Sequence, residues 1–505
     1  MHQTSSRLLR TTSDDRPFTR DLKDLFSTLM VSLKLDTHRI RFTKFNHSFT
    51  AEEAINNLGS LKFSQSNRMP DPKDPSRIVT TTTTTTFSMT REMARTVCQR
   101  FMDARFIEPV DGRLNTQFPM KGSLFHLTPK GIHILQRFCQ RNGITAPHIM
   151  EIIESSRNTM QLVILERDNN TDKLSQDRAI VEVIFRRFIG QDHPNVKPST
   201  SSSDSDSVSE YSTGSVGVKM ARDRKIGTTV HHNTFTGRAC VDWLLDCCTT
   251  VDRRETIELA TMFIDQQLMY PIQEDVTFKQ NSPLFYDFQP TKFAVYGLTD
   301  KGKRVCGWVA RDKPAIPVVD GRTIARDSNN ARLQTILGDA ALRLLFREFL
   351  SYSLCEENLS FYLDVSQFTK QYHEAENVKV LKSMDQVRET LASAYGLYNA
   401  FLAPGSPCEL NIEHNLRNNL ASQMTKAVSD DQSMIESLSE VVRLFEIAQV
   451  SVFKLMSSDS VPKFIRDPKY AAVLQEHEID LSSAGKSHAP MPSFAPERTR
   501  SRSNR

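Results

Sequence analysis

Apolar residues recur at the spacing of α-helices through the C-terminal third of the chain, with short polar corners between the helical stretches. The two neighbouring apolar stripes consist of Leu342, Leu345, Phe349 and Leu350, and of Leu359, Tyr362, Leu363 and Phe368. Between them, residues 351–355 break the pattern and lead into Glu356, Glu357 and Asn358. Two helices are therefore expected to meet at a polar corner.

Residues 330–475 are predicted to be helical almost throughout, and they follow a linker over residues 314–329 that contains Pro314, Pro317 and Gly321. One helix starts around Leu333, and a later one covers residues 438–453. The alternation of strands and helices that is typical of a parallel sheet does not appear. An all-α bundle is the economical interpretation.

The N-terminal part contains an internal repeat. FTAEEAINNL at 49–58 reappears as FTGRACVDWL at 235–244, and two further matches follow in the same order. These are FMDARFIEPV at 101–110 with FIDQQLMYPI at 263–272, and FHLTPKG at 125–131 with YGLTDKG at 296–302. Three matches in one order indicate two copies of one domain.

Each copy is predicted to be a small α+β unit. The pattern indicates an apolar helix, an extended basic arm, a helix opening at Phe-Thr, a second helix ending before Pro, and short strands. The first copy, which is the more divergent one, is assigned to residues 17–145, with a Thr-rich insertion over 70–86. The second is assigned to residues 177–313, starts with a helix over 178–189, and contains a Ser-rich insertion over 195–217.

Several segments have compositions typical of disorder. The two insertions are expected to be solvated spacers, and the acidic Ser-rich one is also a candidate phosphorylation target. The N-terminal residues 1–16 and the basic tail 476–505 are expected to be disordered. In the connector 146–176, a helix, a short apolar strand and a turn are predicted, with no function assigned.

Length and composition limit the classes of function that the chain can have. A chain of 505 residues suggests about three domains. The formal charge of +4 gives no general nucleic-acid signature. No signal peptide or membrane span is apparent, so an intracellular protein with reduced thiols is expected.

One group of possible metal ligands lies close together in the sequence: His231, His232, Cys240, Cys247 and Cys248. Their spacing does not suit a zinc site, so buried structural cysteines are the preferred interpretation.

No enzyme motif is found. The chain has no Gly-rich phosphate loop, no HExxH and no GxSxG, so neither a cofactor nor a metal is assigned. Nucleic-acid binding is disfavoured because the candidate recognition helices are acidic or apolar.

A basic arm is a candidate site for anionic lipid or an acidic receptor tail. It carries Lys219, Arg222, Arg224 and Lys225. A solvated charged face explains it equally well, because Asp223 interrupts the run.

The two N-terminal copies resemble the DEP domain, a winged-helix-like module of signalling proteins. The residues that carry the resemblance are the FTGRACVDWL and FIDQQLMYPI helices and the strand before LTDKG. The first copy has Asn57 where the second has Trp243. The resemblance implies docking to membranes or receptor tails rather than chemistry.

The C-terminal domain resembles the RGS domain, the helical module that accelerates GTP hydrolysis by heterotrimeric G-protein α subunits (Gα). Four motifs occur in family order: FREFL with EENLSFYLDV, YNAFLAPGSPCELNI, and VFKLMSSDSVPKFI. Two DEP-like domains before an RGS domain are similar to the arrangement in fungal regulators that desensitise pheromone or developmental signalling. A cytoplasmic protein, peripheral at the plasma membrane, is expected.

The RGS resemblance implies a Gα-binding surface and no active site of the chain's own. The residues assigned to that surface are Glu357, Asn358, Glu409, Asn411, Leu455, Asp459 and Lys463. Because an Asn amide both donates and accepts, Asn411 is expected to steady the catalytic Gln of Gα. The structural alternatives are that Glu356, Glu357 and Asn358 merely open a helix, and that Asn411 and Asp459 are helix caps.

Two departures from the family pattern favour a second hypothesis. Position 463 is Lys where the family usually has Arg, and Pro462 stands beside it. Lys offers a point charge in place of the two-pronged guanidinium. The alternative function is therefore a scaffold or effector antagonist that binds Gα without accelerating hydrolysis.

Overall fold

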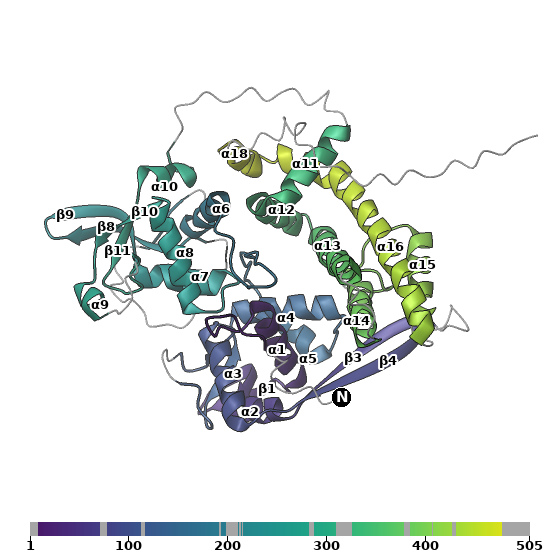
Figure 1. Cartoon of the computed structure of the whole chain (residues 1–505). Coiled ribbons are helices and arrows are strands. Elements are labelled where there is room, and N and C mark those ends of the chain that lie inside the picture. The colour runs from purple at the N-terminus through teal and green to yellow at the C-terminus, as the bar shows by residue number, and fades with distance from the viewer. Residues whose placement is uncertain are drawn as a thin grey trace, which may run out of the picture.

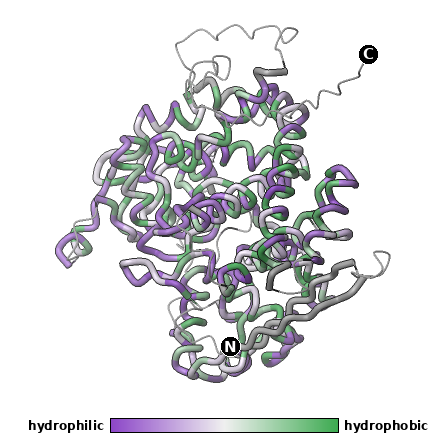
Figure 2. The backbone as a smooth tube through the Cα atoms, turned by 45° about the vertical axis from the view of Figure 1, so that its right-hand side comes forward, coloured by the Kyte–Doolittle hydropathy of each residue, from purple (hydrophilic) through white to green (hydrophobic). Residues whose placement is uncertain are grey.

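The computed structural model describes residues 9–70, 78–112, 117–190, 193–197, 211, 214, 216–281, 287–309, 326–377, 384–406, 408–426 and 431–476. Two α+β domains and one helical domain pack together (Figure 1). Along the helices the backbone alternates between apolar and polar stretches (Figure 2), as expected for helices that bury one face. Within these ranges, no helix has the length and apolar character needed to cross a bilayer.

The first α+β domain is a four-stranded antiparallel sheet, ordered β1-β2-β6-β5, covered by helices. Its elements are α1 (Thr19–Ser32), β1 (Asp36–Ile40), β2 (Thr43–Thr50), α2 (Ala51–Gly59), β3 (Leu61–Pro70), β4 (Ile78–Phe87), α3 (Arg91–Asp103), β5 (Ile107–Pro109), β6 (Leu124–Leu127) and α4 (Pro129–Asn142). The core is aromatic, with Phe26 against Phe101 and Phe106. At the start of α2, Thr50 and Glu53 form a reciprocal capping box.

The second α+β domain repeats this architecture. Its elements are α6 (Arg178–Ile189), β7 (Asn195–Lys197), β8 (Lys219–Ile226), β9 (Thr229–Thr236), α7 (Gly237–Cys247), α8 (Arg253–Asp265), β10 (Met269–Gln273), α9 (Val276–Asn281), β11 (Val295–Leu298) and α10 (Asp300–Val305). The sheet order β8-β9-β11-β10 has the same connectivity as β1-β2-β6-β5, with β7 added at the edge. The internal repeat expected from the sequence is therefore confirmed in the topology.

The repeated Leu-Thr-x-Lys-Gly motif has the same structural role in both copies. Thr128 and Thr299 accept a hydrogen bond from the backbone N–H of Gly131 and Gly302, and so cap α4 and α10. A Cβ on Gly131 would lie 2.1 Å from the Phe106 carbonyl oxygen, and a Cβ on Gly302 would lie 2.0 Å from that of Leu268. The motif requires glycine because the helix start touches the neighbouring backbone.

The interpretation of the Thr-rich insertion as a spacer is wrong. Residues 78–87, which include the threonine run, form β4 and pair antiparallel with β3, from Leu61 with Phe87 to Pro70 with Ile78. β-Branched threonine favours extended backbone, and this preference outweighed the low-complexity signal. The hairpin also contacts α15 (His414–Lys426) of the helical domain (Figure 1).

Other segments expected to be disordered are partly ordered. In the N-terminal segment, residues 9–16 form a turn, and Arg10 pairs with Asp21 at 2.9 Å. At the edges of the Ser-rich insertion, β7 pairs in parallel with β8, and the buried Tyr211 accepts a hydrogen bond from the Lys219 N–H. Most of that insertion, residues 1–8 and the tail from 477 lie outside the described residues.

The connector contains the expected helix, α5 (Pro147–Ile153), but the expected strand is only a single bridge between Val163 and Cys248. The predicted turn is present, with Asp168 accepting hydrogen bonds from the N–H groups of Asn170 and Thr171. The connector therefore runs across the second domain and is held by it.

The C-terminal domain is all-α over its described residues, as expected. Its elements are α11 (Arg326–Gly338), α12 (Ala340–Tyr352), α13 (Glu356–Asn377), α14 (Met384–Phe401), α15, α16 (Asp431–Leu455), a π-helical turn (Met456–Ser460), α17 (Val461–Arg466) and α18 (Pro468–Glu476). α16 packs against α13, α14 and α15. Phe464 inserts between Phe346, Phe349 and Tyr470 and fixes the C-terminal helices to α12.

Candidate functional site

The polar corner joins α12 to α13. Leu354 adopts a left-handed backbone with φ of 53° and leaves 89% of its surface exposed. Asn358 is 7% exposed, and its side-chain amide donates to the Cys355 carbonyl at 3.2 Å. Asn358 thus holds the corner in shape. Because α13 begins at Glu356, these residues do open a helix, and their assignment to a Gα-binding surface stays a prediction.

The second segment is the loop between α14 and α15. The Glu409 carboxylate accepts a hydrogen bond from the Gly405 N–H at 2.9 Å and pairs with Arg417. The Gly405 N–H, and then Arg417, lower the pKa of Glu409, so the carboxylate stays charged and braces the loop. Asn411 is exposed and lies three residues before α15 begins at His414. It does not occupy the N-cap position, so the capping alternative does not apply to it.

The third segment is the π-helical turn between α16 and α17. Leu455 is 39% exposed, and Asp459 and Lys463 form an exposed ion pair at 2.7 Å. Ser460, not Asp459, occupies the position before α17, and it makes no side-chain cap. The capping alternative for Asp459 therefore does not apply. Extra backbone turns of this kind often occur at functional sites.

The three segments converge around two thiols. The pKa of Cys355 is raised, first by burial and then by the Glu357 and Asp459 carboxylates, while Ser460 acts in the opposite direction. The pKa of Cys408 is likewise raised by burial and next by Glu357. The corner is therefore near both of the other segments. Burial also raises the pKa of Glu357 itself, which is half-buried between them.

An arginine from the first domain reaches this corner, which the sequence did not indicate. Arg137 on α4 donates two hydrogen bonds to Glu356, at 2.9 and 3.1 Å, and Arg347 adds a third at 3.3 Å. Burial opposes ionisation of Glu356, but the two arginines hold its pKa below the usual value. Arg137 and Glu356 are 219 positions apart, so their contact could not be inferred from the sequence without knowledge of the fold.

Further ion pairs join the helical domain to the second α+β domain and to the connector. Glu348 on α12 accepts from Arg187 of α6 at 3.2 Å and from Lys469 of α18 at 2.7 Å. Arg343 pairs with Glu166 of the connector at 2.5 Å. The polar corner therefore lies at a junction of all three domains.

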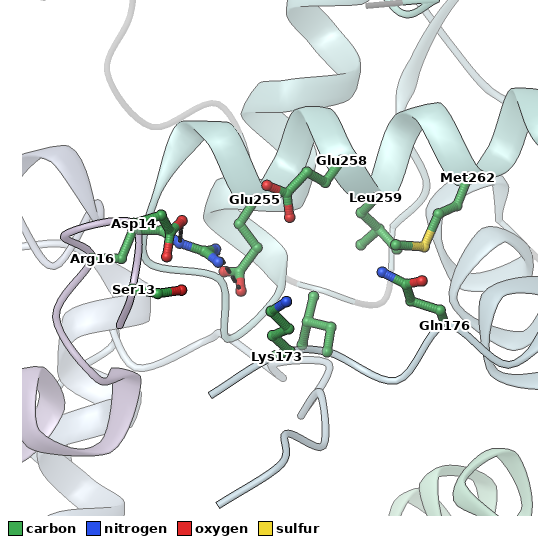
Figure 3. Close-up of a pocket in the computed structure, with 10 residues that line it drawn as sticks. Ser13, Asp14, Arg16, Lys173, Gln176, Glu255, Glu258, Leu259 and Met262 are labelled. Atoms are coloured by element: carbon green, nitrogen blue, oxygen red, sulfur yellow. Dashed lines mark hydrogen bonds and ion pairs between the residues drawn. The ribbon is translucent and has the colours of Figure 1, made fainter. Parts of the chain in front are cut away.

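A separate hollow of about 350 Å³ lies between the N-terminal segment, the connector and α8 (Figure 3). Glu255 points into it and pairs with Arg16 at 3.7 Å and with Arg167. Burial raises the pKa of the neighbouring Glu258. The charged groups of this hollow mainly join three segments of the chain, and nothing in their arrangement matches a nucleophile with its base.

The candidate membrane arm is the β8–β9 hairpin, which projects away from the helical domain (Figure 1). Arg222 and Lys225 are exposed. Lys219 lies over the Tyr211 ring and Arg224 donates to Thr234, so both are partly used within the domain.

The cysteines near this arm are buried, as expected. Cys240 and Cys247 lie on α7, and burial raises the pKa of Cys240, Cys247 and Cys248. His232 instead pairs with Asp223 at 2.6 Å. Among the residues that the structure describes, no cluster of His, Cys, Asp and Glu could hold a metal ion.

Comparison with known families divides the chain into three parts. Residues 332–473 match the Regulator of G protein signaling domain. Residues 217–288 match the DEP domain, found in Dishevelled, Egl-10 and Pleckstrin. Residues 21–155 match the fungal-differentiation regulator winged helix domain. The interpretation of the first copy as a second DEP domain is not confirmed, although its winged-helix character is.

Similar proteins cover most of the chain. The developmental regulator flbA of Emericella nidulans is 70% identical over all of this chain and 70% of its own length. Regulator of G-protein signaling 1 of Schizosaccharomyces pombe is 27% identical over 92% of each chain. Regulator of G-protein signaling 7 of Bos taurus is 31% identical over 30% of this chain and 26% of its own.

Proposed function

Because the chain belongs to the fungal regulators of G-protein signalling, we propose that its helical domain accelerates GTP hydrolysis by a Gα subunit and has no active site of its own. The observation that carries this proposal is the match of residues 332–473 to the RGS domain, and it is supported by Glu357, which lies near enough to both Cys355 in the corner and Cys408 in the loop before Asn411 to raise the pKa of each thiol.

The proposed mechanism is differential binding. A Gα subunit already holds its Mg²⁺, its water-orienting Gln and an Arg, but these lie on mobile switch segments. A rigid surface that fits the switches best in the transition state lowers the barrier without donating a catalytic group. Asn411 suits this role because its exposed amide can accept from one partner and donate to another. Asn358 and Glu409 hold the two flanking loops in shape.

Single-turnover GTP hydrolysis by a fungal Gα, with and without the full chain, tests the proposal. Acceleration by the chain is expected, together with tighter binding to Gα carrying GDP and aluminium fluoride than to Gα with GDP alone. The second candidate, an effector antagonist, is favoured by Lys463, whose charge is already paired with Asp459. Equal binding to the two Gα states, without acceleration, would support that candidate.

We also propose that the DEP domain brings the chain to a receptor tail or an anionic membrane. Arg222 and Lys225, exposed on the projecting β8–β9 hairpin, support this proposal. Replacing both by Gln is expected to weaken vesicle binding and leave GTP hydrolysis in solution unchanged. Retained binding would contradict the role of this hairpin.

A further inference from the structure

The β1–β2 hairpin of the first domain ends in an exposed aromatic turn. Ile40 pairs with Thr43, so Arg41 and Phe42 form a two-residue connection. Residues 39–44 are all exposed, and Phe42 leaves 91% of its surface in solvent. A large apolar side chain presented in this way at a convex tip makes no contribution to the core.

The backbone of this turn is strained. Arg41 has a φ of 52°, in the left-handed region that glycine adopts without penalty and that other residues adopt at a cost. Strain of this kind persists where a side chain is needed at that position for another purpose. The stability of the hairpin therefore does not explain why Arg41 occupies this position.

In the second copy of the domain, the corresponding turn is not strained. In the β8–β9 hairpin Ile226 pairs with Thr229, and the connection is Gly227–Thr228. Gly227 has a φ of 60°, equivalent to that of Arg41, but at a residue type that suits it. The two hairpins share topology and the register next to the turn, so Gly-Thr is sufficient to close this turn. Arg41 and Phe42 are additions specific to the first copy.

The charge around Phe42 has one sign. Arg39, Arg41 and Lys44 are exposed, and residues 37–48 contain no carboxylate. The nearest acid along the chain, Asp36, is paired with Lys34 at 2.9 Å. An apolar apex with basic shoulders is the arrangement that inserts into the interface of an anionic bilayer, where each basic residue near the surface adds affinity.

We propose that the Arg41–Phe42 turn docks on an anionic membrane, with Phe42 among the acyl chains and Arg39, Arg41 and Lys44 at the lipid phosphates. A fluid bilayer fits a convex tip, whereas an extended peptide requires a groove or an open strand edge. The inference rests on the proposal that the N-terminal domains reach a membrane, and it adds a contact made by the winged-helix domain.

The test exchanges the turn for its counterpart in the second copy. The double variant Arg41→Gly, Phe42→Thr relieves the strained φ, so it is expected to unfold no more easily than the wild type. Its binding to vesicles of phosphatidylcholine and phosphatidylserine is expected to fall by at least about tenfold, since it loses both the aromatic and a basic contact. Val450→Ala, which trims an exposed apolar residue on α16, serves as the matched control and should bind as the wild type does.

Each outcome decides the matter. If the exchanged turn binds vesicles as well as the wild type, while the Arg222 and Lys225 variant does not, the inference fails and the DEP proposal stands. If the wild type does not bind vesicles, the inference fails and the DEP proposal is left with the receptor tail alone. If the wild type binds vesicles of phosphatidylcholine alone equally well, the preference for anionic lipid is overturned. If the exchanged variant keeps its binding to vesicles but loses binding to a protein partner, the turn is a protein contact. Acceleration of GTP hydrolysis in solution should be unaffected by the exchange.

Discussion

At the scale of single residues, the side chains that shape the site mostly do so by hydrogen bonds to the backbone of their own loop. Asn358 closes its own corner and Glu409 its own loop, while Asn411 remains exposed. The residue types at the site could be chosen from the sequence, because the motif order indicated an RGS domain. The division between supporting and contacting residues could not, because it depends on hydrogen bonds set by loop geometry.

His133 provides a prediction at this scale. Burial lowers its pKa to about 4, with the positive charge of Arg137 acting in the same direction and Glu356 opposing it. An unfolded histidine has a pKa of about 6.5, so between these values the unfolded state binds more protons and the folded state loses stability as the pH falls. From pH 7 to pH 5 this group is expected to cost about 2 kcal/mol of unfolding free energy.

Denaturant titrations at pH 5 and pH 7 measure that cost. His133→Phe, which removes the titrating group and keeps an aromatic ring, is expected to lack this component of the pH dependence. A variant with the same difference between pH 5 and pH 7 as the wild type would show that His133 is not responsible.

At the scale of secondary-structure elements, the repeat allowed much to be predicted. The helices opening at Phe-Thr and the helix over 178–189 were expected from apolar spacing and are present as α2, α7 and α6. The Thr-rich strand was missed, since a run of one residue type carries no alternation from which a buried face can be inferred. The partner strand β3 decides its conformation, and that pairing is invisible along the chain.

The glycine of the repeated motif gives a prediction for an element. Gly302→Ala is expected to destabilise the second domain by about 1–3 kcal/mol, because the new Cβ would meet the Leu268 carbonyl oxygen at 2.0 Å. Gly338→Ala, at the end of α11, meets nothing within 4 Å and is the matched control, expected to be neutral or slightly stabilising. Thermal unfolding of both variants checks this, and equal stability would contradict the close approach.

At the scale of the whole molecule, the junction between domains is the feature that sequence reasoning missed. It treated the N-terminal domains as targeting modules separate from the RGS domain. The ion pairs of Arg137, Arg187 and Arg343 instead fix α12 and α13 against both α+β domains and the connector. Partners so distant in sequence have no local signature, and each charge alone is indistinguishable from a solvated surface residue.

The Arg137–Glu356 pair tests this junction. Arg137→Ala leaves a largely buried carboxylate with Arg347 as its remaining partner and is expected to cost about 1–3 kcal/mol, less than the loss of a sole partner. A double-mutant cycle with Glu356→Gln should give a clear coupling energy. The same cycle on the exposed pair Arg443 and Glu440 should give less than about 1 kcal/mol. Coupling energies that do not differ would mean that the junction is loose.

The most direct test of the proposed function is single-turnover GTP hydrolysis by a fungal Gα in the presence of full-length wild type, Asn411→Ala or Asn419→Ala. Asn419 is also an exposed asparagine, but it lies on α15 rather than in the converging loop. The wild type and Asn419→Ala are expected to accelerate hydrolysis, and Asn411→Ala to lose at least about tenfold of that acceleration, as removal of a transition-state hydrogen bond does. Full acceleration by Asn411→Ala, or none by the wild type, would contradict the account.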